Sequence, residues 1–361
     1  MTRRADPAPA RRWPLWVSGV VLVLVGQLLS GWKVHHFALT ALALDYHRLG
    51  FVKRGLLGTL LGWLLPERLP LQQAQALWIG QGMLVGAALA LLLVGLTRCR
   101  QGSLVRVAWL SPALFLQAGY NFSFLDGLLL VCCSLALLLL EGTGAMARWR
   151  GLLVIAAATC GALFHESFLL AFLPLLVLRA WRRRPAIALA LLGSALLVGL
   201  LLVVQGGFEA GPAVLQERLA ERFAEPFAAN TVELTSSLGQ NLTSTAAALK
   251  TSGLIKALPG FLYLALLLAS VATSSRQATG FTLAACLAPL LLLPLGTDSS
   301  RWIGFACFNL LLMGLAGDLQ FRLPPRRQAL LLMFTCLGPL GIQGSFPLLG
   351  SALRNLYPLP P

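Results

Sequence analysis

Long apolar runs separated by short polar segments make up most of the chain. The runs are rich in Leu, Ala, Val and Gly, and several approach the length of about 20 residues that a helix needs to cross a bilayer. This pattern predicts membrane helices whose polar residues are confined to the connections. The expected spans are residues 14–32, 74–97, 104–119, 124–140, 186–204, 254–272, 278–295, 303–317 and 329–342.

The composition supports the same class of protein. Of the 361 residues, 57% are hydrophobic and only 11% are charged, whereas a soluble domain is about half apolar and a quarter charged. There are too few polar side chains to cover a water-facing surface. We therefore expect an all-α, polytopic integral membrane protein that forms a single transmembrane domain over residues 1–361, with about eleven membrane segments (roughly 10–12).

The formal net charge of +15 would point to nucleic acid in a soluble protein. Here the basic residues cluster at helix ends, and such clusters orient spans with their positive side in the cytoplasm. The resulting topology places the N-terminus inside, together with 17 of the 28 basic residues and three of the 13 acidic ones. The outer side is then almost neutral. We expect a bacterial inner-membrane protein with membrane lipids around it and no nucleic-acid partner.

Three segments depart from simple spans. Residues 33–70 are expected as an outer loop with a short juxtamembrane helix over 55–65, interfacial or re-entrant and stopped by Pro66. Residues 205–252 form a second, Glu-rich outer (periplasmic) loop. The apolar stretch 152–178 has basic clusters at both ends, so a hairpin fits the charge rule better than a single helix. Its tip would be Phe164–Ser167, lying below the outer surface.

Polar residues gather on the outer side of this topology. Ionisable groups at membrane depth are costly and mark functional sites by default. The candidate residues are Asp45, Arg48, Lys53, Arg54, Asn121, Asp126, His165, Glu166, Asp298 and Arg301. The carboxylates can act as bases or bind a divalent metal, and His165 can carry a proton near neutral pH. The arginines can hold phosphate through paired hydrogen bonds.

Most of the candidates also have a purely structural interpretation. Asp45 can be a solvated loop charge, and Lys53 and Arg54 can be interfacial anchors that snorkel. Asp126 lies near the start of its expected helix, where an acidic side chain favours the helix dipole.

Four further candidates form two local pairs in the sequence. Asp298 can serve as an N-cap three residues before Arg301. His165 and Glu166 can be a hydrogen-bonded pair that only fixes the hairpin.

Two stretches of the chain resemble known membrane enzymes. Leu163–Leu170, in which His165 precedes a Ser-led apolar run, resembles a segment of bacterial polysaccharide polymerases of the Wzy and EpsG type. Asp45-Tyr46 and the short helix after it are similar to the first outer loop of GT-C glycosyltransferases. These resemblances imply a polyprenyl-phosphate-linked sugar donor and a surface glycan product.

We therefore expect a membrane glycosyltransferase or polysaccharide polymerase that acts at the outer face. In this hypothesis Asp45 activates the acceptor hydroxyl, and His165 and Glu166 line the pocket and share proton transfer. The lipid-linked sugar would be bound by Arg48, Lys53, Arg54, Asn121, Asp126, Asp298 and Arg301.

Two other functions stay open on the sequence. A proton-coupled transporter or lipid flippase would use the His165–Glu166 pair and needs a polar path to both faces. A non-catalytic membrane subunit of a surface-glycan or secretion complex would show its polar residues scattered in space.

Overall fold

The chain is mostly helical in the part that the structure describes. The computed structural model describes residues 13–98, 101–142, 147–208, 210–227, 231, 242–243, 245–246, 254–272, 276–296, 298–341 and 344–345. Its strands are two-residue antiparallel pairs, and the mostly helical architecture predicted from the sequence is confirmed. The pairs are β1 (Val271–Ala272) with β2 (Gln320–Phe321) and β3 (Leu340–Gly341) with β4 (Gly344–Ser345).

Two helices, α5 (Leu71–Leu96) and α12 (Pro185–Gln205), are long and apolar enough to cross a membrane. Shorter apolar helices include α1 (Trp13–Leu29) and α16 (Leu254–Leu268). Along α12 large apolar side chains point outward, and Val203 is 85% exposed. A continuous apolar surface of this kind indicates contact with lipid or with another protein.

The centre of the assembly is α18 (Ser299–Leu315), in which every residue is buried. It packs against α16, α17 (Arg276–Leu287), the 3₁₀ helix η3 (Ala288–Leu292) and α6 (Gly102–Trp109). The amide nitrogen of Asn309 in its middle donates to the carbonyl oxygen of Ala171 at 2.8 Å, so this buried donor is paired. Against α16 and α6 lies α19 (Pro325–Cys336).

The expected third span, 104–119, is not continuous. It is split into α6 and α7 (Phe115–Tyr120), and the break contains Pro112. Proline lacks the N–H that a helix interior needs and clashes with the preceding turn. The carbonyl oxygen left free at Pro112 accepts the backbone N–H of Leu340 at 2.9 Å, which ties β3 to this break.

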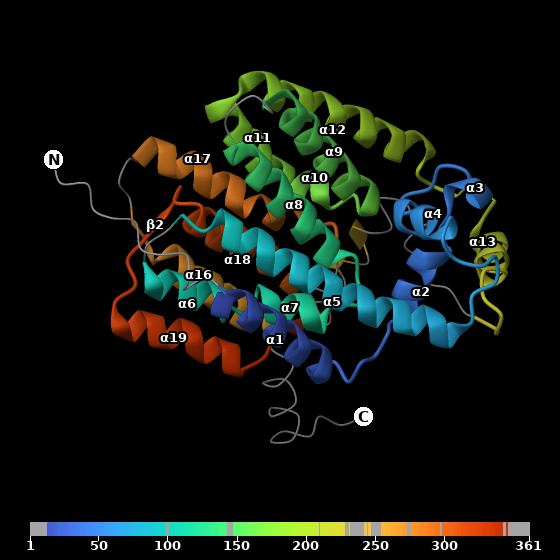
Figure 1. Cartoon of the computed structure of the whole chain (residues 1–361), viewed down its shortest axis with the longest axis horizontal. Coiled ribbons are helices and arrows are strands. Elements are labelled where there is room, and N and C mark those ends of the chain that lie inside the picture. The colour runs from blue at the N-terminus through green and yellow to red at the C-terminus, as the bar shows by residue number, and fades with distance from the viewer. Residues whose placement is uncertain are drawn as a thin grey trace.

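Residues 33–54, expected as a loop, contain two helices instead. They are α2 (His36–Ala43) and α3 (Tyr46–Leu49), followed by α4 (Leu56–Gly62) within the predicted juxtamembrane helix. The run from Ala38 to Ala43 is buried, because its Ala and Leu residues favour helix and pack against α5. Figure 1 shows α2, α3, α4 and α13 (Pro212–Ala220) together at one end of the assembly.

The hairpin expected over 152–178 turns where the sequence predicts. Helix α9 (Ala147–Phe164) stops before His165, and the chain resumes as α10 (Phe168–Ala171) and α11 (Leu173–Arg183). A guanidinium nitrogen of Arg184 donates to the carbonyl oxygen of Gly142 at 2.6 Å. The second arm therefore returns to the level at which the first arm begins.

Helix α8 (Asp126–Glu141) has one charged residue at each end and none between. At its C-terminal end Glu141 accepts from Nε of Arg179 at 3.1 Å, and the same guanidinium binds Asp318 just after α18. At its N-terminal end Asp126 binds Arg301 near the start of α18. The two helices thus run in the same direction between two ionic clusters, which are about 24 Å apart at 1.5 Å per residue.

Only part of the second outer loop is described. Helix α13 buries Leu215 and Leu219, and Phe223 and Phe227 after it are also buried, as their helical spacing suggests. Most of 228–253 lies outside the described residues, as do Glu209 and Glu233. Residues 346–361 lie outside them as well.

Candidate functional site

Arg54 and Glu166 form the first ion pair of the candidate site, although 112 residues separate them. Nε of Arg54 donates to both carboxylate oxygens of Glu166, at 3.2 and 3.0 Å, and Nη2 also binds Oε1. Arg54 is buried, whereas the Glu166 side chain keeps 35% of its exposure. The sequence also allowed Arg54 to be an interfacial anchor whose side chain snorkels to water. That interpretation does not fit, because the side chain is buried.

The backbone of Arg54 is strained. Its φ of +67° lies in the left-handed region, which a side chain with a Cβ adopts at a cost of about 1–3 kcal/mol. Its guanidinium also lies over the ring of Phe37 on α2, with 5.4 Å from Cζ to the ring centroid. Strain that is held in place by an ion pair and a cation–π contact is typical of functional sites.

His165 lies in the turn between α9 and α10 and is buried. The backbone N–H of Ser167 donates to its Nδ1 at 3.2 Å, and Oε2 of Glu166 lies 3.5 Å from the same nitrogen. A nitrogen that accepts an N–H carries no proton of its own, so the neutral ring holds its proton on Nε2. His165 is thereby arranged to donate a hydrogen bond from Nε2.

Asp126 and Arg301 form the second ion pair. Nε of Arg301 donates to Oδ2 of Asp126 at 3.0 Å, and Nη2 binds Oδ1. Both residues are buried, at 2% and 6% exposure. The guanidinium lies over the rings of Trp302 and Phe305, 4.8 and 5.7 Å from their centroids. This paired fork on an aromatic face is a geometry that lysine cannot reproduce.

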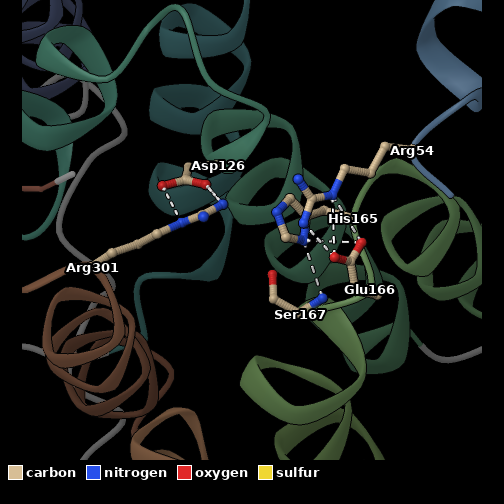
Figure 2. A network of polar contacts seen from close by, with 6 residues as sticks. All are labelled: Arg54, Asp126, His165, Glu166, Ser167 and Arg301. Carbon is tan, nitrogen blue, oxygen red and sulfur yellow. Dashed lines mark hydrogen bonds and ion pairs between the residues drawn. The ribbon is translucent and has the colours of Figure 1, made fainter. Parts of the chain in front are cut away.

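The two ion pairs lie close enough to influence each other. Figure 2 shows them on either side of the His165 ring. Arg54 acts electrostatically on Asp126, and Arg301 acts on His165. Five residues that the sequence analysis selected, in segments far apart along the chain, are thus joined into one polar network. We call Arg54, Asp126, His165, Glu166 and Arg301 the polar network.

Asp45 and Arg48 lie elsewhere. Asp45 is buried and caps α3, with Oδ1 accepting the His47 N–H at 2.7 Å, so it is not the solvated loop charge of the structural interpretation. Its Oδ2 lies beside Gly62 at the end of α4, about 10 Å along that helix from the Arg54 end. Arg48 reaches the carbonyl oxygen of Glu67 at 3.4 Å.

The remaining candidates take local roles in the described structure. Lys53 donates its backbone N–H to the carbonyl oxygen of Gly206 at 3.1 Å. Asp298 precedes α18 but makes no side-chain cap hydrogen bond, and Arg301 pairs with Asp126. Asp298 therefore occupies the N-cap position, as the structural interpretation expected, and its carbonyl oxygen accepts the Arg301 N–H at 2.9 Å, but its side chain does not cap the helix. Asn121 is buried at the turn after α7.

Within the described residues, no three His, Cys, Asp or Glu side chains gather closely enough to share a metal ion. The two carboxylates of the polar network each face an arginine instead. Carboxylates are nevertheless chemically able to bind a divalent metal ion.

Several residues of the site were not selected from the sequence. Phe305 stands four residues after Arg301 on the same helix, so helical spacing could have indicated its contact, whereas the adjacent position of Trp302 gives no such sign. Phe37 and the backbone N–H of Ser167 reach the network only through the fold, and the sequence carries no sign of these contacts.

No protein-family model matches this chain, and no match is found among curated proteins or solved structures.

Proposed function

We propose that the protein is a membrane glycosyltransferase or polysaccharide polymerase that takes a sugar from a polyprenyl-phosphate carrier at the outer face of a bacterial inner membrane. The observation that carries this proposal is the polar network. Two arginine–carboxylate pairs, of which Asp126–Arg301 is buried on both sides, and a buried histidine gather at one end of a helical assembly with apolar outer surfaces. Groups of this kind at membrane depth support a site for a charged substrate.

The orientation follows from the two ends of α8 and α18. The end with Glu141, Arg179 and Asp318 also carries the basic run of 182–184, which positive-inside topology places in the cytoplasm. The opposite end, with the polar network, then faces outward. The separation of about 24 Å along α8 is close to the hydrocarbon thickness of about 30 Å.

Arg54 and Arg301 are the groups that would bind the carrier phosphate. A guanidinium has five N–H donors in a planar fork, and the contact with Asp126 uses only Nε and Nη2 of Arg301. The carboxylates keep each fork aligned before substrate arrives, and the nearby aromatic rings exclude water. Donors aligned in advance stabilise charge that grows on a leaving phosphate.

The proposed transfer needs one base and one departing phosphate. The acceptor hydroxyl gives its proton to a carboxylate, and its oxygen forms a bond to the anomeric carbon. The bond from that carbon to the carrier oxygen breaks, and the phosphate leaves with the electron pair. Asp45, whose contacts involve no bidentate arginine, is the proposed base, and Nε2–H of His165 donates to the sugar or the phosphate.

The transporter alternative is less compatible with this geometry. A proton carried by Glu166 would have to compete with its paired hydrogen bonds to Arg54. Between the two ionic clusters, the described parts of α8 and α18 carry no charged residue that could continue a proton path.

A lipid-binding measurement on the full chain in nanodiscs tests the proposal. Radiolabelled undecaprenyl phosphate should bind, and undecaprenol, which lacks the phosphate, should not. Asp126→Leu combined with Arg301→Met removes one pair without leaving a lone charge and should weaken binding at least tenfold. Arg326→Gln, at the opposite end, is the matched control.

A genetic arm addresses the reaction itself. Deleting the gene in its host should remove a surface glycan, and the wild-type chain should restore it. If Asp45→Asn and His165→Ala both restored the glycan fully, the assignment of these residues to catalysis would fail. Equal binding of the lipid phosphate by wild type and the double variant would overturn the phosphate site.

A further inference from the structure

The two ion pairs of the polar network differ in their access to solvent. In the Asp126–Arg301 pair both side chains are enclosed. In the Arg54–Glu166 pair the guanidinium side chain is 9% exposed, whereas the carboxylate side chain is 35% exposed. The second pair is therefore open to its surroundings on one side, the side of Glu166. This difference suggests that the two pairs do not have the same role.

Glu166 covers the hydrogen-bond donors of Arg54 that a phosphate would use. Nε and Nη2 of Arg54 form one edge of the planar fork, and both donate to carboxylate oxygens of Glu166. Figure 2 shows the carboxylate lying against the guanidinium. Because Arg54 has little exposed surface of its own, the exposed approach to this edge is the place that Glu166 occupies.

Arg54 is also held by contacts that do not involve Glu166. Its guanidinium lies over the ring of Phe37, 5.4 Å from the ring centroid. The residue before it, Lys53, donates its backbone N–H to the carbonyl oxygen of Gly206 at 3.1 Å, and α4 begins two residues after it. We therefore expect Arg54 to keep its position when the carboxylate moves away.

Glu166 has fewer contacts that would hold it. It lies in the turn between α9 and α10, and the side-chain hydrogen bonds of its carboxylate in the described part of the chain all come from Arg54. Oε2 lies 3.5 Å from Nδ1 of His165, but that nitrogen accepts the Ser167 N–H and so has no proton to donate. A rotation of the Glu166 side chain can thus bring its carboxylate into water while the rest of the network stays in place.

We propose that Glu166 is an exchangeable partner of Arg54, which the phosphate of the carrier lipid displaces when it binds. This inference rests on the proposed function and adds a means by which the site selects its ligand. A phosphate monoester carries a charge of about −1.5 to −2 near neutral pH, so it is a stronger partner for a guanidinium than a carboxylate is. The tethered carboxylate competes at a high local concentration, which excludes weakly binding anions.

Removal of the competing carboxylate should strengthen binding of the carrier. Apparent affinity falls with the fraction of the protein that is competent to bind, so a fork that is open for about a tenth of the time binds about tenfold more weakly than one that is always open. Radiolabelled undecaprenyl phosphate is titrated into the full chain in nanodiscs. Glu166→Gln keeps the length of the side chain without its charge, and it should bind the lipid about tenfold more tightly than the wild type.

Glu166→Asp is a second variant that keeps the charge near Arg54. It covers the case in which Glu166→Gln does not fold because the guanidinium has lost its counter-charge. The side chain is one methylene shorter and cannot hold both donors as Glu166 does, so binding should be about threefold tighter. The matched control is Glu217→Gln, which removes a negative charge from an exposed position on α13 and should leave the affinity unchanged.

The results separate this inference from the proposed function. Tighter binding by the Glu166 variants, with no change in Glu217→Gln, supports the exchange. If the wild type binds the lipid and the Glu166 variants bind it equally or more weakly, the exchange is overturned and the phosphate site stands. An equal gain in Glu217→Gln also overturns the exchange, because net charge then explains the effect. If neither the wild type nor any variant binds the lipid, the proposed function and the exchange are both wrong.

Discussion

Arg301 donates from Nε and Nη2 to the two carboxylate oxygens of Asp126, a residue 175 positions earlier in the chain. The pair joins the first residue of α8 to the first turn of α18, and both side chains are buried. Because both side chains are buried, water cannot replace either partner. Each charge is therefore compensated only while the other residue is present.

Removing one partner of this pair should be costly. Asp126→Asn leaves a buried guanidinium without its counter-charge, and breaking a buried pair costs about 3–5 kcal/mol. We expect a clear fall in the midpoint of thermal unfolding in detergent. Asp126→Leu with Arg301→Met should regain much of that stability, because no lone charge is left. If the double variant were as unstable as Asp126→Asn, the cost would not come from the unpaired charge.

The tautomer of His165 can be tested by two amide substitutions. The side-chain amide of Gln reaches about as far as Nε2, and that of Asn only about as far as Nδ1. His165→Gln should therefore keep more transfer activity than His165→Asn if the Nε2–H donor matters. Loss of a general base would reduce both variants alike, by about 10²–10⁴-fold. The measurement is the rate of surface glycan production by the complemented deletion strain, with expression of each variant checked.

The stability of the folded chain should depend on pH through His35. Burial lowers the pKa of His35 below its ordinary value of 6.5, and the charges of His36 and Lys33 lower it further. The groups around the ring are Lys33 and His36 from its own segment and Tyr120 and Phe124 from the facing turn. The ring is thus neutral at pH 7.

The unfolded chain binds the proton more tightly than the folded chain, so stability should fall as the pH drops below 6.5. The measurement is the midpoint of thermal unfolding in detergent at several pH values, and His35→Gln should flatten the profile. An equal loss of stability in His35→Gln and the wild type would contradict the role of His35.

The proposed orientation predicts which side of the membrane each connection occupies. In a cysteine-free background, Arg68→Cys should react with an impermeant maleimide added to intact spheroplasts. Arg326→Cys should react only after the membrane is opened. Both positions are exposed, so access to the reagent should depend on the side of the membrane alone. Labelling of both positions in intact spheroplasts would contradict the topology.

The sequence predicted at which end of the helices the charged residues lie. It did not predict which residues they pair with. Apolar runs and basic clusters indicated that Arg54, Asp126, His165, Glu166 and Arg301 belong at one end of the helices, and the structure brings these five together. Arg301 was expected beside Asp298, since local spacing is all that a sequence displays. Its partner Asp126 comes from a distant helix, and pairing over such a distance is decided by packing.

The helices before and within the site were the least predictable. The polar residues around Asp45 suggested a loop, but the short apolar run of α2 is long enough to form a buried helix against α5. The chemistry of proline could have indicated the helix break at Pro112, but the apolar run around it suggested one span.

The burial of α18 over its whole length has a consequence for how the chain is made. Asp126 leaves the ribosome 175 residues before Arg301, and at 5–20 residues per second the interval is about 10–35 s. During that time the carboxyl group that will lie in the core lacks the Arg301 guanidinium. The nascent chain must therefore hold it protonated, in water or against the insertion machinery. Folding of the complete helical bundle thus requires that the cell protect the incomplete bundle during synthesis.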